Sequence, residues 1–73
     1  MLLIVGERLK RLRKERGVTA QALADAIGVK RRVLVYYESS DRDPSLESIV
    51  NIANYFDCSI DYLVGRSDDP ERH

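Results

Sequence analysis

The 73-residue sequence predicts a compact all-α domain of five short helices. The first observation is the spacing of apolar residues, which recur every three or four positions and so give a helix one apolar face. The second is the set of helix boundaries, with Thr19, Ser45 and Ser59 at predicted N-caps and Gly17 and Gly28 at predicted ends. The third is size, because so short a chain favours short helices and short connections.

The first two predicted helices follow directly from this pattern. Val5, Leu9 and Leu12 form one apolar stripe among charged residues, and Gly17 ends that helix. The second helix begins after Thr19 and ends before Gly28. Its apolar residues are Ala22, Leu23, Ala24, Ala26 and Ile27.

Residues 30–38 leave helix and strand open by propensity, because β-branched and aromatic residues run from Val33 to Tyr37. No hairpin turn follows and the neighbouring segments have helical period, so we predict a third helix here. Turn-forming residues occupy 39–44. Beyond Ser45, a fourth helix buries Leu46, Ile49, Val50, Ile52, Ala53 and Phe56, and a fifth after Ser59 buries Ile60, Leu63 and Val64.

Charge is divided unevenly although the formal net charge is zero. Residues 1–32 contain nine Lys or Arg residues and three Asp or Glu residues. Residues 33–73 contain three Lys or Arg residues and nine Asp or Glu residues. This asymmetry indicates an oriented molecule with one face for a polyanion. A solvated basic helix beside an acidic helical half is the alternative interpretation.

Several function classes are disfavoured. His73 is the only histidine and is terminal, so we expect no histidine base, metal cluster or cofactor, and no enzymatic activity. Cys58 is single and expected in the core, which excludes an internal disulfide. The apolar run from Leu2 to Val5 is too short for a signal peptide or a membrane span. These features favour a cytoplasmic protein.

The segment from Ala24 to Tyr37 predicts a helix-turn-helix formed by the second and third helices. Two helices that cross at about 90–120° need a small residue at their contact and a residue free to adopt positive φ in the turn. Ala24 and Gly28 meet these needs, while Leu34 and Tyr37 face inward. The outward residues of the third helix are then Lys30, Arg31, Arg32, Val33, Val35 and Tyr36.

Five short motifs are distributed over most of the chain, at residues 6–19, 23–29, 37–39, 44–47 and 57–65. Together they resemble the phage-repressor and Cro-type, or XRE-type, helix-turn-helix proteins over residues 5–67. The resemblance implies a DNA-binding domain at residues 1–67, followed by a frayed polar tail at 68–73. It also implies a transcriptional regulator, expected to be a repressor, that binds a palindromic duplex operator as a homodimer. Leu2, Leu3 and Ile4 are expected either to extend the core or to contact a second chain, and the fifth predicted helix with Tyr62 is the other candidate dimer face.

The resemblance also assigns site residues. Base reading falls to Arg31, Arg32 and Tyr36, with Val35 beside them as a candidate contact for a thymine methyl group. Physical reasoning also favours a DNA-binding role for the two arginines. Cations in a first helical turn oppose the macrodipole and so do not serve stability, whereas arginine can bond to guanine O6 and N7. Thr19, Gln21, Lys30 and Arg42 are expected at the DNA backbone. Arg13 and Glu38 are expected to form a structural ion pair between the first and third helices.

Three positions depart from the family pattern. Ala20 stands where glutamine is usual, with Gln21 one place later, and Ser40 and Asp41 stand where glycine and lysine are usual. A carboxylate facing phosphates is repulsive. The predicted third helix is also unusually apolar outside, at Val33, Val35 and Tyr36. The alternative function is therefore protein interaction at the third helix, in an adaptor, an antirepressor-like or an antitoxin-like module.

Overall fold

The computed structural model describes residues 3–71, so Leu2 and His73 lie outside the described range. Within it the regular structure is entirely α-helical, which confirms the predicted fold class. The helices are α1 (Leu3–Glu15), α2 (Ala20–Ile27), α3 (Arg31–Glu38), α4 (Leu46–Phe56) and α5 (Ile60–Leu63). No helix in this range is long and apolar enough to span a membrane.

The helix ends follow the predicted capping residues. Thr19, Ser45 and Ser59 are the N-caps of α2, α4 and α5, and each side-chain oxygen accepts a backbone N–H at 3.0–3.1 Å. Gly28 ends α2 in the left-handed conformation, with φ at 76°. These contacts satisfy backbone groups that a helix end leaves without intrahelical partners.

The segment with strand propensity forms α3 because its apolar residues are placed for helical packing. Leu34 and Tyr37 lie three positions apart and are both buried in the core. Tertiary packing therefore overrides local β propensity. The expectation that Val33 lies outside is wrong, because Val33 is half-buried and packs against the core.

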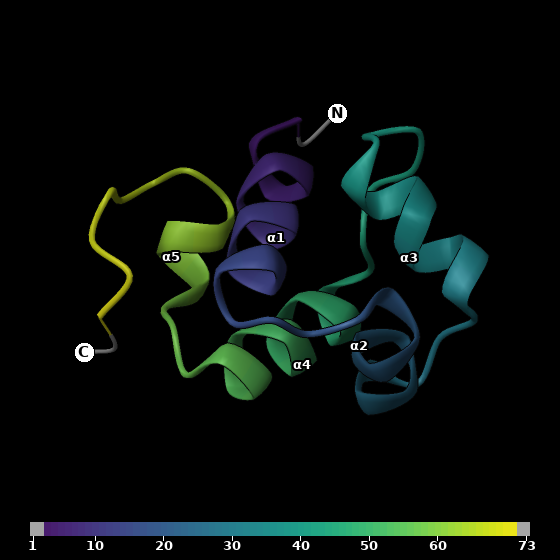
Figure 1. Cartoon of the computed structure of the whole chain (residues 1–73). Helices are drawn as coiled ribbons and strands as arrows, with labels where there is room; N and C mark the ends of the chain where they lie inside the picture. The colour runs from purple at the N-terminus through teal and green to yellow at the C-terminus, as the bar shows by residue number, and fades with distance from the viewer. Residues whose placement is uncertain (1–2, 72–73) are drawn as a thin grey trace.

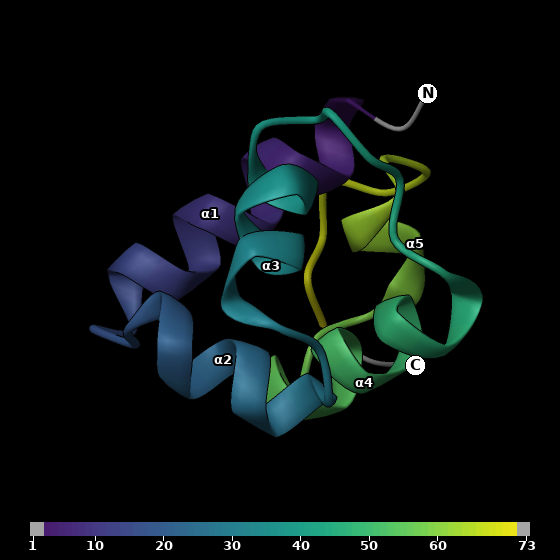
Figure 2. The ribbon, with the colours of Figure 1, turned by 90° about the vertical axis from the view of Figure 1, so that its right-hand side faces the viewer.

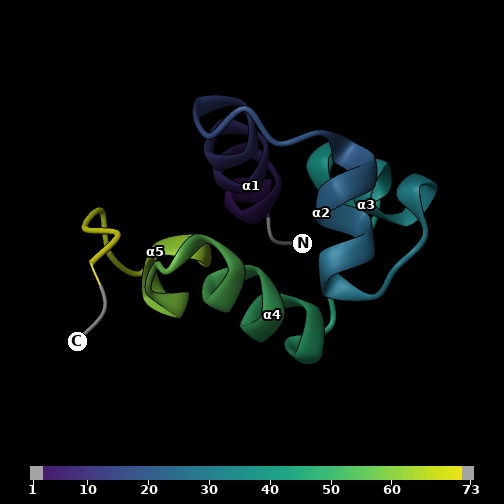
Figure 3. The same ribbon diagram turned by 60° about the horizontal axis from the view of Figure 1, so that its bottom comes forward.

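The five helices enclose one core. Figure 1 shows α1 in the centre, with α3 on one side of it, α5 on the other, and α2 and α4 below. Seen from the side in Figure 2, α3 lies in front with its outer face toward the viewer. Figure 3 shows α4 running from the α2–α3 side of the molecule toward α5. The largest fully buried side chains are Phe56, Leu9, Leu23, Leu34, Ile52, Leu63, Val5 and Cys58.

The position of α3 depends on a close approach to α1 at Gly6. A Cβ atom at Gly6 would lie 2.5 Å from the carbonyl oxygen of Tyr37 and 3.0 Å from that of Glu38. Glycine therefore lets α1 rest directly on the last turn of α3, where any other side chain would separate the two helices. This contact sets how closely the last turn of α3 approaches α1.

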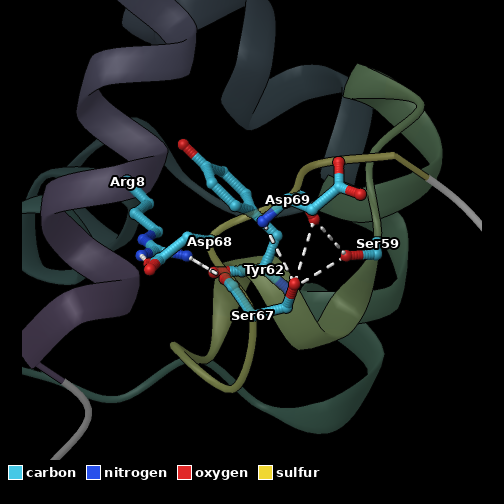
Figure 4. A network of polar contacts seen from close by, with 6 residues as sticks. All are labelled: Arg8, Ser59, Tyr62, Ser67, Asp68 and Asp69. Carbon is cyan, nitrogen blue, oxygen red and sulfur yellow. Dashed lines mark hydrogen bonds and ion pairs between the residues drawn. The ribbon is translucent and has the colours of Figure 1, made fainter.

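The C-terminal segment is held against the body by Arg8 of α1, as Figure 4 shows. The buried guanidinium donates to the carbonyl oxygens of Tyr62 and Ser67 and to Oδ1 of Asp68, which lies 2.8 Å from Nη2. The backbone N–H of Ser59 also donates to the Pro70 carbonyl at 2.9 Å. These contacts engage Asp68 and Pro70, while the domain limit at 67 and the frayed polar tail at 68–73 stay predictions.

Candidate nucleic-acid interface

The outer face of α3 carries an open hollow of about 590 Å³. It is lined by Lys30, Arg31, Arg32, Val35 and Tyr36. The structure thus brings together the residues expected to read bases and one residue expected at the DNA backbone. All five side chains are exposed, so the cationic groups and the Tyr36 hydroxyl are accessible to a ligand.

One end of this hollow is strongly cationic. Lys30 is the N-cap of α3 and its side chain makes no capping hydrogen bond, and Arg31 and Arg32 follow in the first turn. No acidic residue lies in that turn to neutralise them. The positive end of the helix dipole adds to the same field. The arrangement is unfavourable for an isolated helix and favourable for binding an anion.

The other end of the hollow combines an apolar and an aromatic side chain. Val35 keeps 46% of its surface exposed and Tyr36 keeps 39%. The guanidinium carbon of Arg42, from the loop after α3, lies 5.4 Å from the centre of the Tyr36 ring. The face therefore offers cations, a methyl surface and a phenol within one turn or two of helix.

Three residues expected at the DNA backbone, Thr19, Gln21 and Arg42, do not line this hollow. Thr19 and Gln21 are exposed at the start of α2, where the Thr19 hydroxyl oxygen accepts the N–H of Ala22. Nε2 of Gln21 donates to Oδ1 of Asp25 at 2.8 Å, along the same helix. Both side chains are thus engaged within α2 in this structure.

The loop after α3 shows how the chain accommodates its departures from the family pattern. Ser40 has φ at 65°, a left-handed conformation that glycine adopts without strain. Asp41 is exposed, and its Oδ2 accepts a hydrogen bond from the Ser39 hydroxyl at 2.9 Å. The loop keeps its turn without glycine and carries a negative charge beside the hollow.

Arg13 and Glu38 form the expected ion pair between α1 and the last residue of α3. Arg13 Nε donates to Glu38 Oε2 at 2.7 Å, and Nη1 donates to the Val18 carbonyl at 3.1 Å. The hydrogen bond with Glu38 raises the pKa of Arg13 above its usual value, although partial burial acts to lower that pKa. The pair anchors α3 at the end opposite its cationic first turn.

Arg8 has a structural role that was not predicted from the sequence, where it is only one of the basic residues of the N-terminal half. The signal was available in the helical period, because Arg8 lies three positions after Val5 and four before Leu12 and so falls on the buried stripe. Its guanidinium carbon lies 4.2 Å from the centre of the Tyr62 ring. Tyr62 is consequently a core residue of this chain, and a dimer contact at the α5 face stays a prediction.

A model of the helix-turn-helix family matches residues 9–63. Among curated proteins, the chain is 37% identical over 65 residues to YobD, an uncharacterized HTH-type transcriptional regulator of Bacillus subtilis. That match covers 89% of this chain and 58% of YobD. The first three curated relatives are covered over 50–58% of their length, so the chain spans about half of each.

Solved structures of similar fold include a protein–DNA complex and a protein–protein complex. The c2 repressor of Salmonella phage P22, bound to a synthetic operator, is 30% identical with a TM-score of 0.78, covering 82% of this chain and 91% of that one. The Bacillus subtilis SinR/SinI complex contains a chain that is 30% identical, with a TM-score of 0.74. The match covers 81% of this chain and 58% of that one. The resemblance found in the sequence is therefore confirmed, and the chain belongs to the XRE-type helix-turn-helix family.

Proposed function

We propose that the chain binds duplex DNA as a transcriptional regulator in the cytoplasm, with α3 in the major groove and without an enzymatic step. The observation that carries the proposal is the exposed hollow on α3, which has cations at one end and Val35 and Tyr36 at the other. An α-helix fits the major groove, where base edges and thymine methyl groups are accessible. The P22 repressor structure with its operator supports the same use of this fold.

The residues of the hollow divide the work of recognition. Arg31 and Arg32 are exposed in the first turn of α3, and each can donate two hydrogen bonds to O6 and N7 of guanine. Val35 offers methyl groups to a thymine methyl, and the Tyr36 hydroxyl can donate to or accept from a base edge. The guanidinium groups carry the larger share of base discrimination, at about 1–3 kcal/mol per bidentate pair.

Phosphate contacts fall to the residues around the hollow. Lys30 at the N-cap of α3 and Arg42 in the following loop are both exposed cations. Thr19 and Gln21 lie at the start of α2, and we expect each to contact a phosphate after its side chain rotates away from its partner within α2. We expect two copies to bind a palindromic operator whose half-sites lie about 34 Å apart.

Selection of duplexes from a random pool tests the proposal. The enriched duplex should bind with an affinity that falls steeply with salt, because each neutralised phosphate releases counterions. Arg31→Ala and Arg32→Ala should weaken binding to the enriched duplex at least about fivefold and relax the preference at individual base pairs. Arg66→Ala removes one exposed cation beyond α5 and is the matched control. Absence of any enriched duplex, or salt-independent affinity, would overturn the proposal.

A protein partner at α3 is the second candidate function. Val35 and Tyr36 are exposed on α3, and a similar chain is found in the SinR/SinI protein complex. Val35→Ser tests this alternative, because Val35 is exposed whereas Val33 packs against the core. Loss of a pulled-down partner with unchanged DNA affinity would favour the protein-binding role. Loss of DNA affinity with no partner affected would exclude it.

A further inference from the structure

The backbone carbonyl of Tyr36 anchors the loop that follows α3. It accepts hydrogen bonds from the backbone N–H groups of Asp41 at 3.0 Å and Arg42 at 3.3 Å. The Ser39 hydroxyl donates to the same oxygen at 3.2 Å. These contacts fold the loop back onto the last turns of α3. The backbone of Arg42 is therefore close to the backbone of Tyr36.

The side chains of the same two residues also meet. The guanidinium carbon of Arg42 lies over the Tyr36 ring, 5.4 Å from its centre, within the range of a cation–π contact. Such a contact does not use the N–H groups of the guanidinium. All five of these donors can therefore still form hydrogen bonds. The ring can therefore restrict the position of the charge while the donors stay available for an anion.

The place of this pair relative to the hollow suggests its use. The cations at residues 30–32 lie at the start of α3, and Arg42 lies beyond its end. A helix of eight residues is about 12 Å long, so Arg42 places a cation beyond the opposite end of α3 from residues 30–32, in a loop that also carries the exposed Asp41 carboxylate. Tyr36 belongs to the lining of the hollow and to the contact with Arg42, so it connects the two.

We propose that Tyr36 is a positioning residue, whose ring holds the Arg42 guanidinium in place for a DNA phosphate next to the bases that α3 reads. The inference rests on the proposed DNA binding. The Tyr36 side chain would then have two separable functions. Its hydroxyl contacts a base, and its ring positions Arg42. The conservative variant Tyr36→Phe keeps the ring, whereas Tyr36→Leu removes it.

A double-mutant cycle on the enriched duplex tests the proposal. With Arg42 present, Tyr36→Leu should bind about two- to fivefold more weakly than Tyr36→Phe, because the cation–π contact is lost. In an Arg42→Ala background the two variants should have equal Kd values. Arg42→Ala should also reduce the slope of log K against log salt by about 0.9, as expected for one phosphate contact. Arg66→Ala should leave the ratio between the two Tyr36 variants unchanged.

A measurement on the free protein separates this inference from the proposed function. The side-chain NMR signals of Arg42 should show a ring-current shift that persists in Tyr36→Phe and disappears in Tyr36→Leu. The positioning role would be overturned if the wild type binds the duplex but the ratio of the Tyr36→Leu Kd to the Tyr36→Phe Kd is the same with Arg42 and with Arg42→Ala. DNA binding itself would then remain supported. An absent ring-current shift in the wild type would overturn the positioning role as well. If no duplex is bound by the wild type, the proposed function and this inference both fail.

Discussion

Glu38 binds Arg13 through both of its carboxylate oxygens, and this pair joins α1 to the C-terminal end of α3. Oε2 accepts from Arg13 Nε at 2.7 Å and Oε1 accepts from Nη2 at 3.1 Å. The side chains are only 9% and 16% exposed, for Glu38 and Arg13 respectively. Two parallel hydrogen bonds in a largely dry position make this pair stronger than an ordinary surface ion pair.

Glu38→Ala should lower the free energy of unfolding by about 2–4 kcal/mol, because it leaves a partly buried guanidinium without its carboxylate. Glu47→Ala is the control, since Glu47 is exposed in the first turn of α4 and contributes a dipole interaction of under about 1 kcal/mol. For a domain of this size each kcal/mol shifts Tm by about 4–8 °C. Thermal melts followed by circular dichroism measure the difference, and equal Tm values for the two variants would contradict the prediction.

Gly6→Ala should destabilise the protein although glycine lies inside a helix. At most helical positions this substitution stabilises by about 1 kcal/mol. Here the new Cβ would lie 2.5 Å from the Tyr37 carbonyl oxygen, a backbone atom, so α1 and α3 must move apart. We expect a net loss of about 1–3 kcal/mol in urea denaturation. Lys10→Ala, at an exposed position of the same helix, should change little, and a stabilised Gly6→Ala variant would show that the helices yield easily.

The fold was predictable where local chemistry and packing agree. Thr19, Ser45 and Ser59 cap their helices through hydrogen bonds that depend only on a side-chain oxygen at the residue before the helix. The segment 31–38 was harder, because its propensity favours a strand and only burial of Leu34 and Tyr37 selects the helix.

The site was less predictable than the fold, because its details depend on contacts between distant residues or on side-chain orientation. The hollow on α3 brings the expected cations together, since they are neighbours on one helix. The Gln21–Asp25 hydrogen bond joins positions i and i+4 of one helix and could have been predicted, whereas no local pattern places Arg42 over the Tyr36 ring. The hydrogen-bond partners of Arg8 are separated from it by 54 to 60 positions in the sequence, and no local pattern specifies them.

Arg8→Met should release the C-terminal segment and lower stability by about 2–3 kcal/mol. The variant removes charge-assisted hydrogen bonds to the carbonyl oxygens of Tyr62 and Ser67 while keeping an unbranched side chain in the buried position. Amide hydrogen exchange should then accelerate at Ser59, whose N–H donates to the Pro70 carbonyl. Asp68→Asn is the matched control, because the Asp68 side chain is fully exposed and should leave Tm unchanged. Unaltered exchange at Ser59 in Arg8→Met would show that Arg8 does not hold the segment.

Asp41→Asn should strengthen DNA binding if the loop after α3 approaches the phosphates. The exposed carboxylate carries a negative charge beside the cationic hollow, and the amide oxygen of asparagine can still accept the hydrogen bond from Ser39. Removing the repulsion should lower Kd about two- to fivefold at low salt, and the gain should shrink as salt screens it. Asp41→Lys should lower Kd further and steepen the salt dependence by about 0.9, for one added phosphate contact. Glu71→Gln removes an exposed carboxylate beyond α5 and should have no effect. Equal affinities for the wild type and Asp41→Asn at low salt would place this loop away from the duplex, and would direct attention to the first turn of α3 as the main source of binding energy.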